Sequence, residues 1–586
     1  MSVLVQINEA IERHERFVAT KVRDARTKPA FRRKLLTRWQ AVRSSIAEVT
    51  TPTGLKLPRL ALPQTEDPGE IAQFLFGEGL PGEFPFVNAA YREMYLEAPG
   101  GESPTAGVEE PTRLFAGLGL AADTNQRFHY LTKHQKSLRL STAFDGPTLY
   151  GLDSDADGVS GKVGEGGVAI DTIEDMERLF AGFPLGDPQF SASMTINGPA
   201  PILLAMYVAA AKRRHGPGVV PKLRGTVQAD ILKEVQAQNE TIFPTDASMR
   251  FLGDMIEYTT THMPRWYPIS ISGYHIAEAG ATPVQQAAYT LSNGFAYVEM
   301  LRARGLDVNR FGPRLSFFLD CSLDIEYLAL ARVCRKLWAI AMRDVFGADA
   351  RAQLFKLHTQ TSGRSLVAHE FKNNLTRTAI ELMLAYANAT NSCHSNSADE
   401  PFTTPAEEYV RLASHAQSIL LEESGLFKHM MNTLAGSPGM KIVERAVEAA
   451  MLEEWRAIDE LGGVMAATEL RYQRSQIQAA AHRYERQIAE HKRPIIGLNR
   501  YREAEASPGV TVVRTPRAKQ RSQVARVQVF KRRHRAKAAP ALDRLTCVVE
   551  SGGNVFAELL STVEHCSLGQ ITECLHESVG RFRPMV

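Results

Sequence analysis

Short runs in which apolar residues alternate with small polar residues recur between residues 138 and 396. Such alternation predicts a β-strand, because successive side chains of a strand point to opposite faces. Amphipathic helical segments lie between the runs, and one of them begins with the helix-start pair Thr282-Pro283. The runs cover residues 138–145, 189–197, 225–230, 268–275, 314–320, 354–361 and 391–396.

The repeat of strand and helix predicts the fold class. Consecutive runs begin roughly 30 to 50 residues apart, which suits parallel strands joined by helices better than a sandwich. We therefore predict an α/β protein built on a (β/α)8 TIM barrel. Seven strands are recognisable, and the pattern does not reveal the eighth.

Helical patterns flank the predicted barrel on both sides. Residues 1–50 combine apolar stripes with many charges, and the proline-rich residues 52–82 predict an extended connector. Residues 98–106 predict a surface loop, and residues 494–499 predict a short returning strand after helices that continue to about 490. We expect an N-terminal helical arm and extended connector over 1–80, a catalytic barrel over 81–500, and a basic linker with a C-terminal helical segment over 501–586.

Polar side chains follow the predicted strands where each strand ends. In a parallel barrel these ends meet at one mouth, which is where active sites lie. Convergence at the mouth is hard to explain by packing alone, although for His275 a satisfied core histidine is the alternative. The residues are Asp145, Asn197, Gln228, His275, Gln360, His394 and Asn396.

The strands are also rich in serine and threonine at positions where barrel interiors usually hold valine, isoleucine and leucine. Small hydroxylated side chains would leave a polar bore wide enough for an extended ligand. The alternative is that they face the helices or hydrogen-bond locally. They are Ser141, Ser191, Ser193, Thr195, Thr226, Ser270, Ser272, Ser316, Thr359 and Thr361.

Composition narrows the class of protein. The 586 residues are 44% hydrophobic and 23% charged, with no apolar run long enough for a membrane span and no signal-peptide pattern, so we expect a cytoplasmic globular protein without membrane contact. The six cysteines form no Cys-x-x-Cys pair and the histidines are scattered, so we predict reduced thiols and no metal site in this chain.

Basic residues are concentrated in one segment of the chain. The net charge is only +3, yet residues 514–537 carry ten lysines and arginines. A solvated helix or linker explains such a run, and a subunit or phosphate contact is the alternative. We do not predict a nucleic-acid partner.

Standard catalytic signatures for P-loops, zinc proteases, serine hydrolases and dinucleotide-binding folds are absent. Instead, a series of segments in order along the chain resembles the acyl-CoA mutases that depend on adenosylcobalamin. The segments are FPF (84–86), PTRLFAG (111–117), STAFDGPTLYG (141–151), SMTINGPAP (193–201), GTVQADILKE (225–234), SISGYHIAEAGA (270–281), PRLSFF (313–318), HTQTSGRSL (358–366) and PIIGLN (494–499), and GGNVFAELLSTVEHCSLGQIT (552–572) extends the match.

The resemblance implies a (β/α)8 barrel threaded by coenzyme A, with a separate flavodoxin-like domain that presents cobalamin to the barrel mouth. The Asp-x-His-x-x-Gly motif of that domain is absent from the 586 residues. We therefore expect adenosylcobalamin to be held mainly by a separate small subunit, in a heterodimer or heterotetramer, and a G-protein chaperone remains an open partner.

Two positions imply the substrate. Methylmalonyl-CoA enzymes have Tyr and Arg where this chain has Phe115 and Gln238, and a free carboxylate needs that cation. The Phe and Gln pair resembles isobutyryl-CoA mutase, which isomerises isobutyryl-CoA to n-butyryl-CoA. Enzymes for 2-hydroxyisobutyryl-CoA carry Ile and Asp at positions 115 and 143. Another branched acyl-CoA (2-hydroxyisobutyryl, pivalyl or methylmalonyl) is the alternative substrate.

The segments SCHSN (392–396) and NTLAGSP (432–438) depart from the family pattern, as does a long loop at 96–108. They leave a catalytically silent acyl-CoA-binding barrel or scaffold as a second alternative.

The resemblance also implies roles for single residues. His275 and Gln228 would hydrogen-bond the thioester carbonyl, and Phe115 would pack against substrate and adenosyl group. For Tyr91, a purely structural role is the alternative. Substrate contacts are implied at Gln238, Ala143, Phe144 and Phe318; coenzyme A contacts at Arg113, Tyr91, Ser141, Thr195, Thr226, Arg314, Ser316, His358 and Gln360; and adenosyl contacts at Tyr274, Glu278, Asn396 and Glu400.

Overall fold

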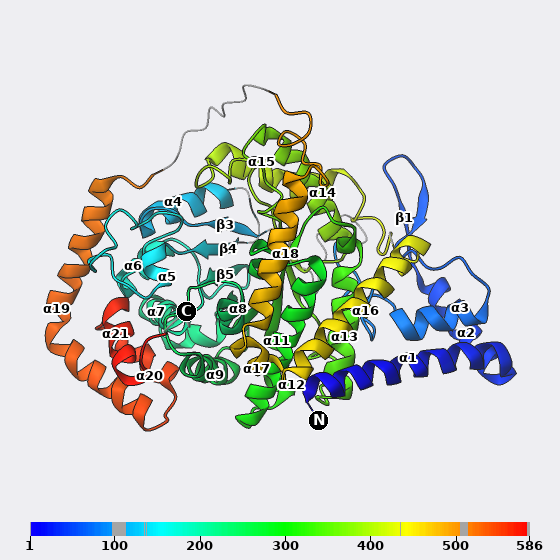
Figure 1. The fold of residues 1–586 in the computed structure, drawn as a ribbon, viewed down its shortest axis with the longest axis horizontal. Coiled ribbons are helices and arrows are strands. Elements are labelled where there is room, and N and C mark those ends of the chain that lie inside the picture. The colour runs from blue at the N-terminus through cyan, green and yellow to red at the C-terminus, as the bar shows by residue number, and fades with distance from the viewer. Residues whose placement is uncertain are drawn as a thin grey trace.

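Parallel strands form the centre of the molecule (Figure 1). The computed structural model describes residues 2–96, 113–133, 135, 138–433, 435–503 and 514–582, so the predicted loop at 98–106 lies outside the described residues. Strands β3 (Leu114–Ala116), β4 (Leu138–Ala143), β5 (Phe190–Thr195), β6 (Gly225–Val227) and β7 (Trp266–Tyr267) pair in that order. Strands β8 (Ile269–Ser272), β9 (Leu315–Cys321), β10 (Leu357–Thr361) and β11 (Ser392–His394) pair in a second sheet.

Backbone hydrogen bonds join the two sheets at both edges. Strands β7 and β8 are separated only by Pro268, which has no N–H for a ladder, so they are two parts of one strand. The Ser270 N–H donates to the Gln228 carbonyl at 2.9 Å, and the Arg113 N–H donates to the Cys393 carbonyl at 3.1 Å. The fold is the predicted (β/α)8 barrel, and the eighth strand is β3, whose three residues are too few for a visible alternation.

Helices surround the strands (Figure 1). The helix predicted from Thr282-Pro283 is α11 (Pro283–Ala303), and its start is a capping box in which the Thr282 and Gln285 side chains bond each other's backbone N–H. Other helices of this layer are α4 (Ala121–Thr132), α7 (Ala200–His215), α8 (Ile231–Gln236), α9 (Thr245–His262), α10 (Tyr274–Glu278), α13 (Leu330–Asp344), α14 (Asn374–Ala387) and α15 (Glu407–Ser418).

The N-terminal arm extends from one side of the barrel (Figure 1). It holds α1 (Val3–Thr27), α2 (Pro29–Ser45) and a hairpin of β1 (Glu48–Thr50) and β2 (Lys56–Pro58). Leu4, Ile7 and Ile11 of α1 are buried in the main core, and α1 packs against α13 and α16 (Pro438–Glu460). The connector predicted to be extended is only partly so, because Asp67 caps a short helix, α3 (Pro68–Gln73).

The predicted strand at 494–499 is wrong. Following α17 (Val464–Glu469) and α18 (Tyr472–Ala489), these residues form a turn, with Gly497 at φ +79°. The Asn499 side chain accepts from the Ile495 N–H at 2.6 Å and donates to the Arg493 carbonyl at 2.9 Å. These local bonds occupy the backbone groups that a strand would offer to a neighbour.

The basic run forms the start of a long helix, α19 (Arg517–Glu550), which lies along one edge of the molecule (Figure 1). It is followed by α20 (Val555–Thr562) and α21 (Leu568–Val579), and α20 packs against α7 and α9. Inward-facing cations of α19 pair with carboxylates: Lys519 with Asp123, and Lys531 with Asp153 at 2.8 Å. Among the described residues, no helix combines the length and apolarity that crossing a bilayer requires.

Candidate active site

A cavity of about 1010 Å³ runs through the barrel. Seven of the ten hydroxylated strand residues line it: Ser141, Ser191, Ser193, Thr195, Thr226, Ser270 and Ser316. The other three hydrogen-bond locally instead: Ser272 Oγ donates to the Ser270 carbonyl, Thr359 pairs with Thr390, and Thr361 accepts from the Asn396 N–H. The bore is therefore polar because small hydroxyl side chains replace bulky aliphatic ones.

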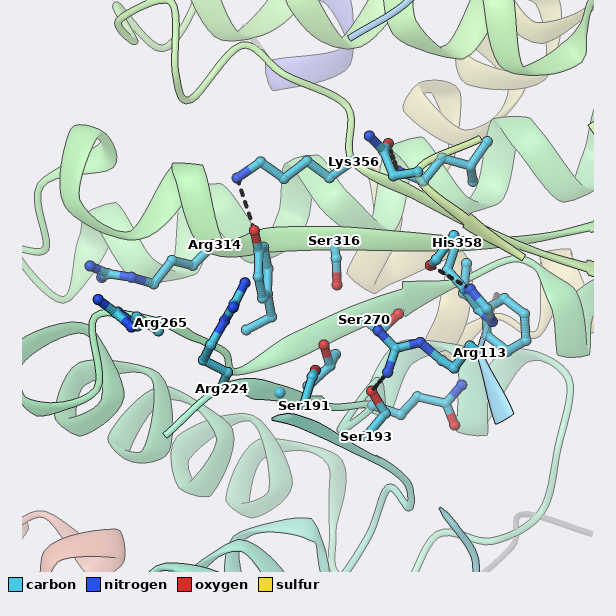
Figure 2. A pocket seen from close by; sticks show the side chains of 18 of the residues that line it. Arg113, Ser191, Ser193, Arg224, Arg265, Ser270, Arg314, Ser316, Lys356 and His358 are labelled. Carbon is cyan, nitrogen blue, oxygen red and sulfur yellow. Dashed lines mark hydrogen bonds between the residues drawn. The ribbon is translucent and has the colours of Figure 1, made fainter. Parts of the chain in front are cut away.

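Cations gather at the N-terminal ends of the strands, at one end of the cavity. Figure 2 shows Arg224, Arg265 and Arg314 together there, with Ser191, Ser270 and Ser316 farther along and Arg113 and His358 at the other end. Among the described residues that line the cavity there is no aspartate or glutamate. This end therefore suits a polyanion such as a group of phosphates. The full set of cations is Arg113, Arg139, Arg224, Arg265, Arg310, Arg314, Arg351 and Lys356.

The guanidinium of Arg314 is fixed by the backbone. Its Nε donates to the Pro264 carbonyl at 3.1 Å, and its Nη1 donates to the Thr260 and Arg310 carbonyls at 3.2 and 3.0 Å. These acceptors are neutral, so the positive charge stays available to a ligand. Tyr91 also lines the cavity.

His358 and Gln360 line the cavity from β10. His358 Nδ1 lies 2.8 Å from Ser392 Oγ, and burial together with the nearby charge of Arg113 holds the pKa of His358 well below its usual range. Gln360 Nε2 donates to Tyr274 Oη at 3.0 Å and to Asn396 Oδ1 at 2.7 Å. The sequence-predicted residues Tyr274, Gln360 and Asn396 thus form one hydrogen-bonded group at the C-terminal mouth.

Gln228 lies at the C-terminal end of β6 in a buried network. Its Oε1 accepts from Asn197 Nδ2 at 3.1 Å, and its Nε2 donates to Ser272 Oγ at 2.7 Å. Asp230 locks this arrangement, because its own N–H donates to Asn197 Oδ1 and its carboxylate accepts from the Ser272 N–H. One amide N–H of Gln228, which lines the cavity, remains for a ligand.

His275, on α10 just past β8, stands beside the aromatic wall of the cavity. Its ring lies edge-on to Phe318 at 5.7 Å between centroids, and Phe318 lines the cavity. Tyr274 stacks on Phe318 at 4.8 Å. Burial, with a smaller contribution from the charge of Lys233, holds the pKa of His275 well below its usual range, so the imidazole is neutral near pH 7. Its Nδ1 is buried and has no partner among the described residues.

A second cavity of about 320 Å³ adjoins the first at Phe115, Arg113 and His394. Gly117, Ala143 and Glu400 line it, and a Cβ atom on Gly117 would lie 2.2 Å from the Ala143 carbonyl oxygen. A side chain at position 117 would therefore collide with the end of β4, and only glycine allows this close approach. The Glu400 carboxyl is open to solvent through the cavity, yet the surrounding protein displaces enough water to raise its pKa to about 7.

Six predicted site residues line neither cavity. His275, Tyr274 and Asn396 lie in the contacts described above, and the other three are Gln238, Phe144 and Glu278. Phe144 is buried in the main core. Glu278 accepts from Ser362 Oγ and from the Gly363 and Arg364 N–H groups, so it fixes the loop after β10. Six lining cations were not predicted from the sequence: Arg139, Arg224, Arg265, Arg310, Arg351 and Lys356. Arg224, Arg265 and Lys356 stand immediately before a strand, a position that would have revealed them.

Metal ligation is not apparent in the site. No group of three or more histidine, cysteine, aspartate or glutamate side chains that could hold a metal ion occurs in the part of the chain that the structure describes. The six cysteines are free thiols, and Cys547 alone among them is exposed.

The chain is similar over most of its length to known proteins. Residues 51–581 match the family model described as methylmalonyl-CoA mutase. A fused isobutyryl-CoA mutase from Geobacillus kaustophilus is 44% identical over 568 residues, covering 92% of this chain and 51% of that protein. The fused isobutyryl-CoA mutase from Cupriavidus metallidurans is 43% identical, covering 91% and 50%. The 2-hydroxyisobutanoyl-CoA mutase large subunit from Aquincola tertiaricarbonis is 36% identical, covering 86% and 88%. This chain thus spans about half the length of the fused relatives.

Proposed function

We propose that this chain, which belongs to the methylmalonyl-CoA mutase family, is the substrate-binding part of a coenzyme B12-dependent isomerase that interconverts isobutyryl-CoA and n-butyryl-CoA. The observation that carries the proposal is the barrel cavity, cationic at one end, hydroxyl-lined along its length, and ending beside the neutral donors Gln228 and His275. Its relatives of 43–44% identity are named isobutyryl-CoA mutases.

Coenzyme A fits the cavity in a single direction. The arginines at the N-terminal ends of the strands would take its phosphates, and the hydroxyl-lined bore would hold the thinner pantetheine arm. The thioester would then reach the C-terminal end, near Gln228 and Phe318. Arg314, Ser316, Tyr91, Ser141, Thr195, Thr226, His358, Arg113 and Gln360 are the proposed contacts along this path.

The thioester carbonyl would accept hydrogen bonds from Gln228 and His275. The network around Gln228 fixes its amide with one N–H unused, and His275 is a neutral imidazole that can donate without being charged. Such preorganised donors stabilise negative charge on the acyl oxygen as the carbon skeleton rearranges. Phe115 and Ala143 would bound the acyl group on the opposite side, and Gln238 supplies no cation for a carboxylate.

The second cavity fits an adenosyl group of adenosylcobalamin. Phe115, Gly117 and Glu400 line this cavity, and the group of Tyr274, Gln360 and Asn396 lies at the C-terminal mouth of the barrel. When bound, the cofactor supplies a radical by homolysis of its cobalt–carbon bond. The chain's own part is to hold the adenosyl group with Glu400 and Asn396, separate it from the acyl group by the Phe115 ring, and exclude water.

Cobalamin itself would be held mainly by a partner, because no Asp-x-His-x-x-Gly motif occurs in this sequence. We propose a small cobalamin-binding subunit that docks at the C-terminal mouth, with a G-protein chaperone as a further candidate partner. About half of the length of a fused relative lies outside the part that this chain matches. A cobalamin-binding domain joined covalently to this chain is therefore the competing arrangement.

The decisive experiment is a gas-chromatographic assay of isobutyryl-CoA conversion with this chain, a cobalamin-binding partner and adenosylcobalamin. We expect n-butyryl-CoA from the wild type and from the control His482→Ala, which changes an exposed histidine on α18. His275→Ala should lower kcat roughly 100- to 1000-fold, the usual cost of one preorganised donor.

Other outcomes of the assay point to other functions. Preferred turnover of methylmalonyl-CoA would show that Phe115 and Gln238 were misinterpreted. Preferred turnover of pivalyl-CoA or 2-hydroxyisobutyryl-CoA would assign another branched substrate. Binding of isobutyryl-CoA without any conversion, in a complex shown to form, would support the silent barrel.

A further inference from the structure

Helix α19 has two faces of different character. Its buried face includes Val527, Phe530 and Leu545. Cations beside the buried face are paired with carboxylates of other elements, as Arg533 is with Glu174. The opposite face is exposed along the edge of the molecule (Figure 1). This outer face is therefore free to contact another molecule.

Four exposed arginines form a row on the outer face, and their side chains have no recorded partner among the described residues. They are Arg517, Arg521, Arg532 and Arg535. Their spacing places them within a sector of about 60° around the helix axis, and the row is about 27 Å long. Residues 514–542 contain no aspartate or glutamate, so the helix itself does not neutralise this row.

Small side chains lie beside the arginine row. Ala518, Ala525, Val529 and Ala536 are exposed, and their spacing places them together on the neighbouring side of the helix. The distance between the axes of two packed helices depends on the side chains at the contact, so small ones allow a close approach. A helix packed there would bring its own side chains within reach of the arginines, whose planar guanidinium groups bind carboxylates through two parallel hydrogen bonds.

Other anionic partners fit this face less well. The inner face of α19 is buried, so the helix cannot enter the major groove of DNA as a recognition helix does. Val529, at 43% exposure, is the bulkiest aliphatic side chain on the exposed face, which offers too little apolar surface to insert into a membrane. A second copy of α19 would place arginines opposite arginines, which is unfavourable.

We propose that the outer face of α19 is a docking surface for a partner protein, and that the partner contributes a helix with a row of aspartates or glutamates beside small residues. Charge complementarity along the arginine row would fix the orientation of that helix. The row begins near the second cavity, because Thr515, just ahead of Arg517, donates from Oγ1 to the Gly164 carbonyl at 2.7 Å. The same loop includes Gly166, which lines that cavity. The proposal does not depend on which acyl-CoA the barrel binds.

The test measures binding of a fluorescein-labelled helical peptide to the whole chain by fluorescence anisotropy. The peptide has about 20 residues, to match the length of the row, and carries glutamates on one face beside alanines. A second peptide has glutamine in place of every glutamate. We expect the glutamate peptide to bind with a micromolar Kd at low salt, at least about tenfold more tightly than the glutamine peptide, and more weakly as the salt concentration rises.

Two double variants test the two parts of the surface. Arg521→Gln/Arg532→Gln removes two charges from the row and should weaken binding of the glutamate peptide roughly 3- to 10-fold. Ala518→Gln/Ala525→Gln leaves the charge unchanged but hinders close approach, and it should weaken binding by a similar factor. The four positions are exposed, so both variants should fold, and thermal unfolding verifies this.

The matched control is Arg483→Gln/Arg486→Gln, which removes the same charge from exposed positions of α18 and should leave the affinity unchanged. An equal loss of affinity in this control would overturn the proposal, because general charge would then attract the peptide. An unchanged affinity of the alanine variant would overturn the docking of a helix. Absence of binding at about 1 mM glutamate peptide and low salt would also overturn the proposal. Tighter binding of a DNA duplex, or of phosphatidylcholine vesicles containing phosphatidylserine, would assign the face to phosphate ligands instead.

Discussion

His14 of α1 is a buried histidine that lies outside the candidate site. It is 3% exposed, its ring lies edge-on to Phe84 at 5.5 Å, and both ring nitrogens lack a partner among the described residues. Burial, followed by the charge of Lys336, lowers its pKa from 6.5 to about 4. The folded chain therefore binds fewer protons at this residue than the unfolded chain between those two pH values.

His14 should accordingly destabilise the protein as the pH falls. Its contribution to stability is intact above pH 6.5 and is lost as the pH falls toward 4. We expect His14→Phe to be more stable relative to wild type at about pH 4.5 than at about pH 7, by about 2 to 3 kcal/mol. Urea unfolding of both proteins at both pH values measures this difference. An equal difference at both pH values would contradict a lowered pKa.

At the scale of single residues, the sequence predicts which residue types line the site better than it predicts what contacts each side chain. The hydroxyl residues of the strands were recognisable because strand periodicity assigns them to one face, and seven of them line the cavity. The surroundings of Gln238 were not, because its side chain is bound by the buried Lys233 and its backbone carbonyl by Arg474, which is 236 residues away. The proposed roles of His275, Gln228 and Glu400 stay predictions until the assay is done.

Among the elements, the C-terminal helices support the loop that follows β4. Lys531 of α19 binds Asp153 at 2.8 Å and Asp155 at 2.7 Å. At the start of α21, Ser567 Oγ donates to Asp153 Oδ2 at 2.6 Å. Ahead of α19, Thr515 Oγ1 donates to the Gly164 carbonyl at 2.7 Å. This loop includes Gly166, which lines the second cavity.

Removing the charge of Lys531 should destabilise the loop that follows β4. Lys531→Met leaves the Asp153 carboxylate, whose side chain is 3% exposed, without its cation. We expect a loss of about 2 to 4 kcal/mol in the free energy of unfolding, since a buried charge is left unpaired. Urea unfolding and amide hydrogen exchange at residues 153–171 measure the effect. Arg535→Met, an exposed cation of the same helix without a recorded partner among the described residues, should change stability by less than about 0.5 kcal/mol.

Helices and strands were predicted correctly where the hydrophobic pattern extends over many residues. The prediction failed where the pattern is short or where local hydrogen bonds determine the backbone conformation. Strands β4, β5 and β9 and helix α11 show clear patterns over six or more residues and match the prediction. Strand β3 is too short for a pattern, and residues 494–499 are apolar enough for a strand but are held as a turn by Asn499. The basic run predicted as a solvated helix is a helix, but part of it is paired with the barrel.

For the whole molecule, the separation of charge is the property that matters for ligand capture. The chain has a net charge of only +3, yet the barrel cavity has eight arginines and lysines and no described acidic residue in its lining. Low-dielectric walls around such a site strengthen attraction for an anion. The domain boundaries and the cytoplasmic location stay predictions.

Affinity for coenzyme A should therefore depend on salt. Raising the salt concentration from about 0.1 M to about 1 M shortens the Debye length from ~10 Å to ~3 Å, and we expect it to weaken coenzyme A binding roughly tenfold. Binding of dephospho-coenzyme A should be weakened less, and binding of pantetheine least, because these ligands carry fewer phosphates. Titration calorimetry at both salt concentrations measures the affinities of the three ligands. Equal salt dependence for all three ligands would show that the phosphates lie away from the arginines.

The contact between Ser567 and Asp153 also bears on the order in which the protein can mature. The two residues are 414 positions apart. A ribosome adding about 5 to 20 residues per second needs roughly 20 to 80 s to cover that distance. Through that interval the loop after β4 lacks its contact with Ser567, so the lining of the second cavity is completed only after residue 567 has been synthesised. A nascent chain would hence complete the strands around its large cavity, the last of which ends at His394, before the loop beside its second cavity is fixed.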